Sequence, residues 1–156
     1  MERYSLQGKV EITAHSFLFF SIMNPKQFLT LGGIVLALVG VLGMIGILGP
    51  TKEGSIFGGY WWFDAGENWT HLLLGVVALI AAFALKPDMQ KPLTLVVGIV
   101  ALAVGVIGFL LPNEVPNFLG ANLENPLDNI LHLVVGIWAV WAWKGTKAPM
   151  AMGTGM

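Results

Sequence analysis

The sequence contains no cysteine and little charge. Of its 156 residues, 11% are charged and 56% are hydrophobic, and the mean hydropathy is +0.76. A soluble domain of this size carries about a quarter charged residues, so the composition indicates a protein that faces lipid. The absence of cysteine excludes disulfides, thiolate metal sites and cysteine nucleophiles. The formal net charge of −1 gives no overall attraction to nucleic acid, and we expect no nucleic-acid partner.

Recognisable catalytic motifs are missing as well. The sequence has no G-x-S-x-G, no H-E-x-x-H and no phosphate-binding glycine loop. Carboxylates are absent from the interior of its apolar runs, whereas proton-coupled carriers usually need them there. We therefore expect a protein that is not an enzyme, and a small permease is the least favoured of its functions.

Four apolar runs are long enough to cross a bilayer. A helix that crosses the hydrocarbon core needs roughly 20 apolar residues, with a range of about 17 to 25. The four runs cover residues 28–48, 69–85, 92–111 and 127–143. They are continuously apolar, whereas the strands of a membrane barrel alternate between apolar and polar residues. The sequence therefore predicts an all-α membrane protein with four transmembrane helices.

The charged residues divide between the two sides of these predicted spans. Seven of the eight basic residues lie on one side, namely Arg3, Lys9, Lys26, Lys86, Lys91, Lys144 and Lys147. Six of the nine acidic residues lie on the other side, namely Glu53, Asp64, Glu67, Glu114, Glu124 and Asp128. Basic loops stay in the cytoplasm. We therefore expect both termini to be cytoplasmic, in a bacterial inner membrane or a thylakoid membrane.

The spans repeat in pairs. At an offset of 65 residues, Gly33, Gly40 and Gly43 of the first span align with Gly98, Gly105 and Gly108 of the third. At an offset of 61, Asn68, His71, Gly75 and Ala78 of the second span align with Asn129, His132, Gly136 and Ala139 of the fourth. Each unit contributes two spans, so the copies share one topology and a pseudo-twofold axis along the membrane normal. The fold is thus predicted as two parallel-repeat hairpins, residues 24–88 and 89–144.

The remaining segments give weaker predictions. Residues 1–23 form an N-terminal cytoplasmic segment, in which residues 10–23 are expected to be a helix at the membrane interface. The aromatic run 60–63 is expected in the aromatic belt at the opposite interface. Residues 86–88 are expected to form a tight polar turn, and residues 145–156 a disordered tail.

The duplicated polar positions are the candidate site. Their spacing places Asn68, His71 and Gly75 on one stripe of a helix, and Asn129, His132 and Gly136 on the equivalent stripe. The favoured interpretation is packing, with polar bonds between helices and glycines that permit close crossing. In the alternative, His71 and His132 are axial ligands of haem or (bacterio)chlorophyll, and the glycines leave room for the macrocycle.

The sequence does not predict a metal site. Two histidines fall short of the three or four ligands of a zinc site. Glu67 and Asp128 would complete such a site, but acids in loops near a membrane surface are usually solvated, and this was expected here.

The pattern Asn-x-x-His-Leu-x-x-Gly occurs at residues 68–75 and again at residues 129–136. It resembles a family of small four-helix bacterial membrane proteins of unknown function, found in cyanobacteria among other groups. In that family a glycine-rich span precedes each helix that carries the motif. The resemblance covers roughly residues 24–144, supports the fold and implies no activity.

These observations favour a structural or accessory membrane subunit. We expect it to contact membrane lipids and to assemble with itself or with a larger membrane complex. The alternative is a cofactor-binding subunit for electron transfer or light harvesting, in which His71 and His132 hold the haem or chlorophyll.

Overall fold

The computed structural model describes residues 23–112 and 116–145. The predicted interfacial helix at residues 10–23 and the predicted disordered tail fall outside these ranges, apart from one border residue each. The described part is helical, as the sequence predicts. Its elements are α2 (Pro25–Met44), the short 3-10 helix η1 (Gly58–Tyr60), α3 (Ala65–Ala84), α4 (Pro87–Leu110) and α5 (Leu127–Lys144). These residues contain no strand, only an isolated bridge between Phe118 and Ala121.

Three of the helices, α2, α3 and α4, are long and apolar enough to cross a membrane. The fourth, α5, has the predicted position but does not meet the same measure. It has 18 residues, and Asp128, Asn129, His132 and Lys144 lower its mean hydropathy. The fold and composition thus suit a membrane-embedded protein, with three clear candidates for spanning helices.

Helix ends are set by capping residues that shift the predicted bounds. Asn24 caps α2 through a reciprocal pair of hydrogen bonds with Gln27. Asp64 and Glu67 form the same capping box on α3, which therefore begins four residues before the predicted span. At the other end of α2, Gly46 adopts a φ of +87°, so the helix ends before the predicted residue 48.

The predicted turn at residues 86–88 is wrong in extent. Helix α4 already begins at Pro87, with Lys86 as its N-cap residue. Proline suits the first helical position because its missing N–H has no helical partner there. The buried Gln90 closes the connection, because its Nε2 donates to the carbonyls of Ala82 and Leu85 at 2.9 and 3.0 Å.

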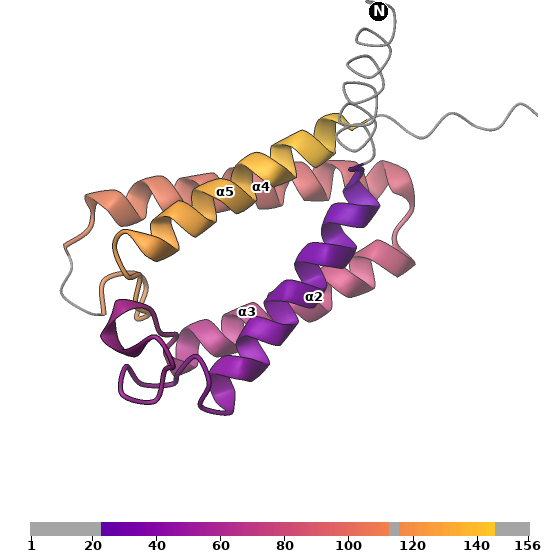
Figure 1. Cartoon of the computed structure of the whole chain (residues 1–156). Coiled ribbons are helices and arrows are strands. Elements are labelled where there is room, and N and C mark those ends of the chain that lie inside the picture. Colours follow the sequence, from indigo (N-terminus) through magenta and orange to yellow (C-terminus); the bar gives the residue numbers. More distant parts are fainter. Residues whose placement is uncertain (1–22, 113–115, 146–156) are drawn as a thin grey trace, which may run out of the picture.

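The helices pack in two pairs (Figure 1). Helix α2 runs along α3, and α4 runs along α5, while α2 also contacts α4 and α5. Glycines permit the close approach within each pair. A Cβ atom on Gly40 would lie 2.6 Å from the carbonyl oxygen of Asn68, and one on Gly105 would lie 2.8 Å from that of Asn129. Real Cβ atoms do not approach so closely, so these positions need glycine.

The two pairs meet at what we call the basic end of the molecule, which carries Lys26, Lys86, Lys91 and Lys144 (Figure 1). A cluster of buried side chains joins the helices here, comprising Phe28, Leu29, Ala81, Ala82, Ala139 and Ala142. The Phe28 ring packs edge-on against Trp138 with 4.7 Å between ring centroids. The opposite or acidic end carries Glu53, Asp64 and Glu124 before or between helices, and Glu67 and Asp128 in the first turns of α3 and α5.

Large apolar side chains are exposed along every long helix. Examples are Val35, Val77, Ile99 and Ile137, each more than half exposed at 55%, 56%, 56% and 61%. In water such surfaces would drive association, whereas in a bilayer they face lipid tails at no cost. The surface therefore agrees with the membrane character that the composition indicates.

Candidate functional site

The duplicated asparagines are completely buried between paired helices. Asn68 and Asn129 both have an exposed fraction of 0%. The Asn68 Nδ2 donates to the carbonyl of Phe63 at 3.1 Å, whereas neither polar atom of the Asn129 side chain has a partner among the described residues. Each amide lies against a glycine of the paired helix, Gly43 or Gly108, in the space that a Cβ would occupy. Both asparagines are therefore packed in equivalent contacts.

The histidines lie one turn further along each helix. His132 places its Nδ1 2.7 Å from the carbonyl oxygen of Asp128, so this ring nitrogen donates the hydrogen bond. His71 is half-buried and its Nδ1 has no partner in the described chain. Its ring packs edge-on against Phe63 at 5.2 Å. The charges of His132 and Asp128 both act on His71, which places the two stripes in electrostatic range of one another.

The glycines of the motif lie under neighbouring helices. A Cβ on Gly75 would lie 2.5 Å from the backbone nitrogen of Ala37, and a Cβ on Gly136 would lie 2.6 Å from the Leu102 side chain. Helices α2 and α4 thus already fill the space that the cofactor interpretation assigned to a macrocycle. These contacts favour the packing interpretation of both glycines.

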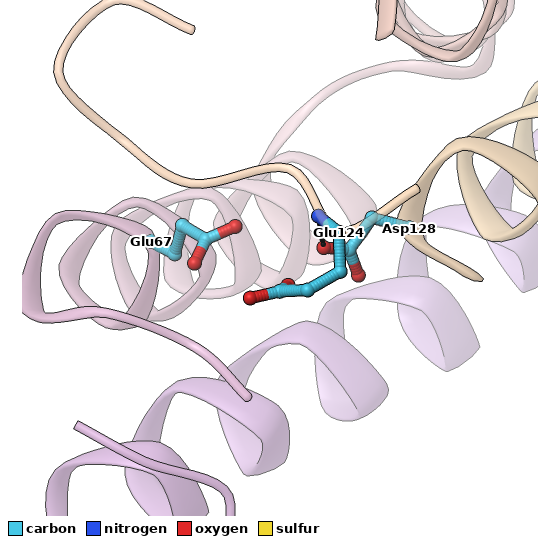
Figure 2. Close-up of side chains that lie close together, drawn as sticks. All are labelled: Glu67, Glu124 and Asp128. Carbon is cyan, nitrogen blue, oxygen red and sulfur yellow. Dashed lines mark hydrogen bonds between the residues drawn. The ribbon is translucent and has the colours of Figure 1, made fainter. Parts of the chain in front are cut away.

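An acidic cluster, defined here as Glu67, Glu124 and Asp128, lies at the acidic end near the histidines (Figure 2). One carboxyl oxygen from each residue lies within 4.8 Å of the others. Glu67 is in the first turn of α3 and Asp128 in the first turn of α5, while Glu124 belongs to the loop before α5. The cluster therefore joins the two helix pairs.

The expectation that Glu67 and Asp128 are solvated loop acids is wrong. Their exposed fractions are 6% and 1%. Both belong to helices, and hydrogen bonds hold them in place. Asp128 accepts from Trp61 Nε1 at 2.6 Å and from the backbone N–H of Glu124 at 2.8 Å. Glu67 accepts from the Asp64 N–H at 2.9 Å within the capping box.

No basic side chain neutralises the acidic cluster within the described ranges. The one ion pair among the described residues joins Lys52 and Glu53 at 4.0 Å, and both side chains are mostly exposed. Burial raises the pKa of Glu124 to about 10, and the neighbouring Asp128 carboxyl acts in the same direction.

Part of this cluster has a sequence signal. Glu67 and Asp128 are related by the same offset of 61 as the histidines, so each motif is preceded by an acid. Glu124 has no such signal, because its position depends on how the loop folds back.

The aromatic residues 60–63 differ in their exposure. Tyr60 is 85% exposed, but Phe63 is 2% exposed and packs inward.

A surface hollow of about 790 Å³ opens beside the cluster. It lies between the two loops of the acidic end and is lined by residues of 51–62 and 122–127, including Asn122 and Glu124. The hollow therefore reaches the edge of the cluster at Glu124, while Glu67 and Asp128 lie deeper.

Comparison of the chain with family models, with curated proteins and with solved structures found no match. What the structure defines is a class: an all-helical protein with three helices long and apolar enough to cross a membrane. The fold and the site geometry therefore carry the functional argument.

Proposed function

We propose that the protein is a membrane-integral structural or accessory subunit without enzymatic activity, built from two hairpins of the same topology. The equivalent contacts of Gly43 with Asn68 and of Gly108 with Asn129 support the repeat. In this arrangement α5 is the fourth span, because its charged residues, Asp128 and Lys144, lie at its two ends. The resemblance to small four-helix bacterial membrane proteins belongs to the same proposal.

One observation carries the structural role. The asparagines and glycines that recur in the sequence lie in contacts between helices: the asparagines are buried, and neighbouring helices cover Gly75 and Gly136. The exposed surface of the helices is apolar along their length. A protein with filled seams and apolar outer faces is suited to pack against other membrane helices, either of a second copy or of a larger complex.

Extraction in a mild detergent tests this role. We expect the protein to migrate as an oligomer or with a partner, well above the 16.8 kDa of one chain. Native mass spectrometry would give the stoichiometry. A monomer without partners under conditions that preserve known membrane complexes would contradict the proposal.

The second candidate function is binding of haem or (bacterio)chlorophyll through His71 and His132. The observation in its favour is His132, whose Nδ1 is held by a backbone carbonyl. A carbonyl that accepts a hydrogen bond from one ring nitrogen commonly orients the other nitrogen of a ligating imidazole. The covered glycines weigh against it, because a macrocycle would have to lie elsewhere along the helices.

The visible absorption spectrum of the extracted protein decides between the two functions. A structural subunit is expected to be colourless. A Soret or chlorin band that follows the protein and is lost in the His71→Ala/His132→Ala double variant would establish the cofactor function instead. The variant should fold, because both rings are only partly buried.

A further inference from the structure

The acidic cluster has no ion pair with a basic side chain in the described part of the chain. Three carboxyl groups from both helix pairs converge within 4.8 Å, and two of the three residues are almost fully buried. The titratable groups near them are His71, His132 and the capping Asp64. Lys52 lines the hollow beside Glu124, but its amine pairs with the exposed Glu53 and not with the cluster. Burial of several acids without a cation is unfavourable unless protons or a metal ion neutralise them.

A second observation at the same place indicates a ligand. Asn122 is 3% exposed, and its Nδ2 donates to the Glu124 carboxylate. The Nδ2 arm of the amide points at the cluster, and the Oδ1 is buried without a partner among the described residues. The two arms have the same shape, so a rotation of the amide by half a turn would direct this Oδ1 at the cluster. The Glu124 Oε2 is buried and unpartnered in the same way. Buried oxygens without hydrogen bonds are rare in folded proteins, and an unplaced ion is one of the ordinary explanations.

The donor set is made of hard oxygen ligands. Carboxylate and amide oxygens suit Ca²⁺, which binds at about 2.3–2.6 Å, so ligands on opposite sides of the ion lie up to about 5 Å apart. The carboxyl oxygens here already lie within that separation. Mg²⁺ requires a tighter octahedron at about 2.0–2.1 Å and prefers to keep its waters. We propose that Glu67, Glu124 and Asp128, together with the Asn122 Oδ1, form a Ca²⁺ site.

Such an ion would connect the two helix pairs at the acidic end. Glu67 comes from α3, whereas the other ligands come from the loop before α5 and from α5 itself. A hydrogen bond from Trp61, in the segment between α2 and α3, to Asp128 of α5 already connects the two pairs at this end. The surface hollow beside Asn122 and Glu124 gives the ion a route from the loop side. This inference goes beyond the accessory role and does not depend on it.

The Trp61 indole provides a direct probe, because it donates a hydrogen bond to one of the ligands. Tb³⁺ replaces Ca²⁺ in oxygen sites and emits when a nearby tryptophan is excited. We expect the full-length protein in detergent to give saturable, tryptophan-excited Tb³⁺ emission that Ca²⁺ displaces. Glu124→Gln and Asp128→Asn should weaken binding at least tenfold. Asp88→Asn is the matched control, since it removes one negative charge from an exposed side chain at the opposite, basic end.

Thermal unfolding keeps the test valid if a variant is poorly folded. Ca²⁺ should raise the Tm of the wild-type protein and of Asp88→Asn, but not that of Glu124→Gln. The ion-free Glu124→Gln protein should itself unfold in a cooperative transition, which establishes that the variant is folded. An absence of Tb³⁺ emission, emission that Ca²⁺ does not displace, or an equal loss in Asp88→Asn would each overturn the proposal.

Discussion

At the scale of single residues, the glycines divide into two kinds that the sequence does not distinguish. Gly75 lies against the backbone of α2, where a Cβ would approach Ala37 and Gly33 at 2.5 and 2.8 Å. Gly32, one residue from a glycine in the seam, has nothing within 4 Å of its Cβ position. The first kind is required by packing, and the second is not.

Replacement of Gly75 and of Gly32 by alanine should therefore change the free energy of unfolding differently. Gly75→Ala forces two backbones apart and should destabilise the protein by about 1–3 kcal/mol, the usual range for overpacking. Gly32→Ala is the matched control and should leave the free energy of unfolding unchanged or raise it by up to about 1 kcal/mol, because alanine favours the interior of a helix. Reversible unfolding in mixed micelles would measure both. Equal effects of the two substitutions would contradict the seam described here.

Residue identity also sets the limit of what could be predicted at the site. The Asn, His and Gly stripes were found because they recur at a fixed offset, and the structure places the asparagines and glycines in helix seams. The acid before each motif recurs in the same way, but an acidic residue near the end of a predicted span is expected to face solvent, and the sequence gives no sign that it is buried. Glu124 cannot be placed from the sequence, because it reaches Glu67 only when the loop before α5 folds back.

At the scale of elements, apolar runs located the helices and capping residues corrected their ends. All four runs correspond to helices, because a continuous apolar segment of this length has few other stable forms. The errors lie at the termini of α2, α3 and α4, where Gly46, the Asp64–Glu67 pair and Pro87 decide the boundary. Hydropathy carries no information on these local hydrogen bonds and dihedral angles, so it cannot place them.

Helix α5 is the element whose role differs most from a simple apolar span. Its first turn supplies Asp128 and Asn129, which are buried at 1% and 0% exposure, and its last residue is Lys144. Of these two, Asp128 belongs to the acidic cluster and Asn129 packs against Gly108 of α4. We propose that the remainder crosses the membrane, with Lys144 at the opposite surface.

At the scale of the whole molecule, charge is separated along the long axis. Lys26, Lys86, Lys91 and Lys144 lie at the basic end, and the acidic cluster lies at the other (Figure 1). Under the positive-inside rule this separation supports a cytoplasmic basic end and cytoplasmic termini. The proposed orientation requires that α5 is a fourth span. In a protein with three spans both ends of α5 would lie on the same side of the membrane, and Lys144 would be separated from the other lysines of the basic end.

The absence of cysteine makes this claim directly measurable. Single cysteines would be introduced at Lys52 and Leu119 at the acidic end and at Lys86 and Lys144 at the basic end. Intact cells would then be treated with a maleimide that does not cross membranes. The account predicts labelling of Lys52→Cys and Leu119→Cys, and labelling of Lys86→Cys and Lys144→Cys only after the membrane is permeabilised. Labelling of Lys144→Cys in intact cells, with Lys86→Cys protected, would contradict the four-span arrangement.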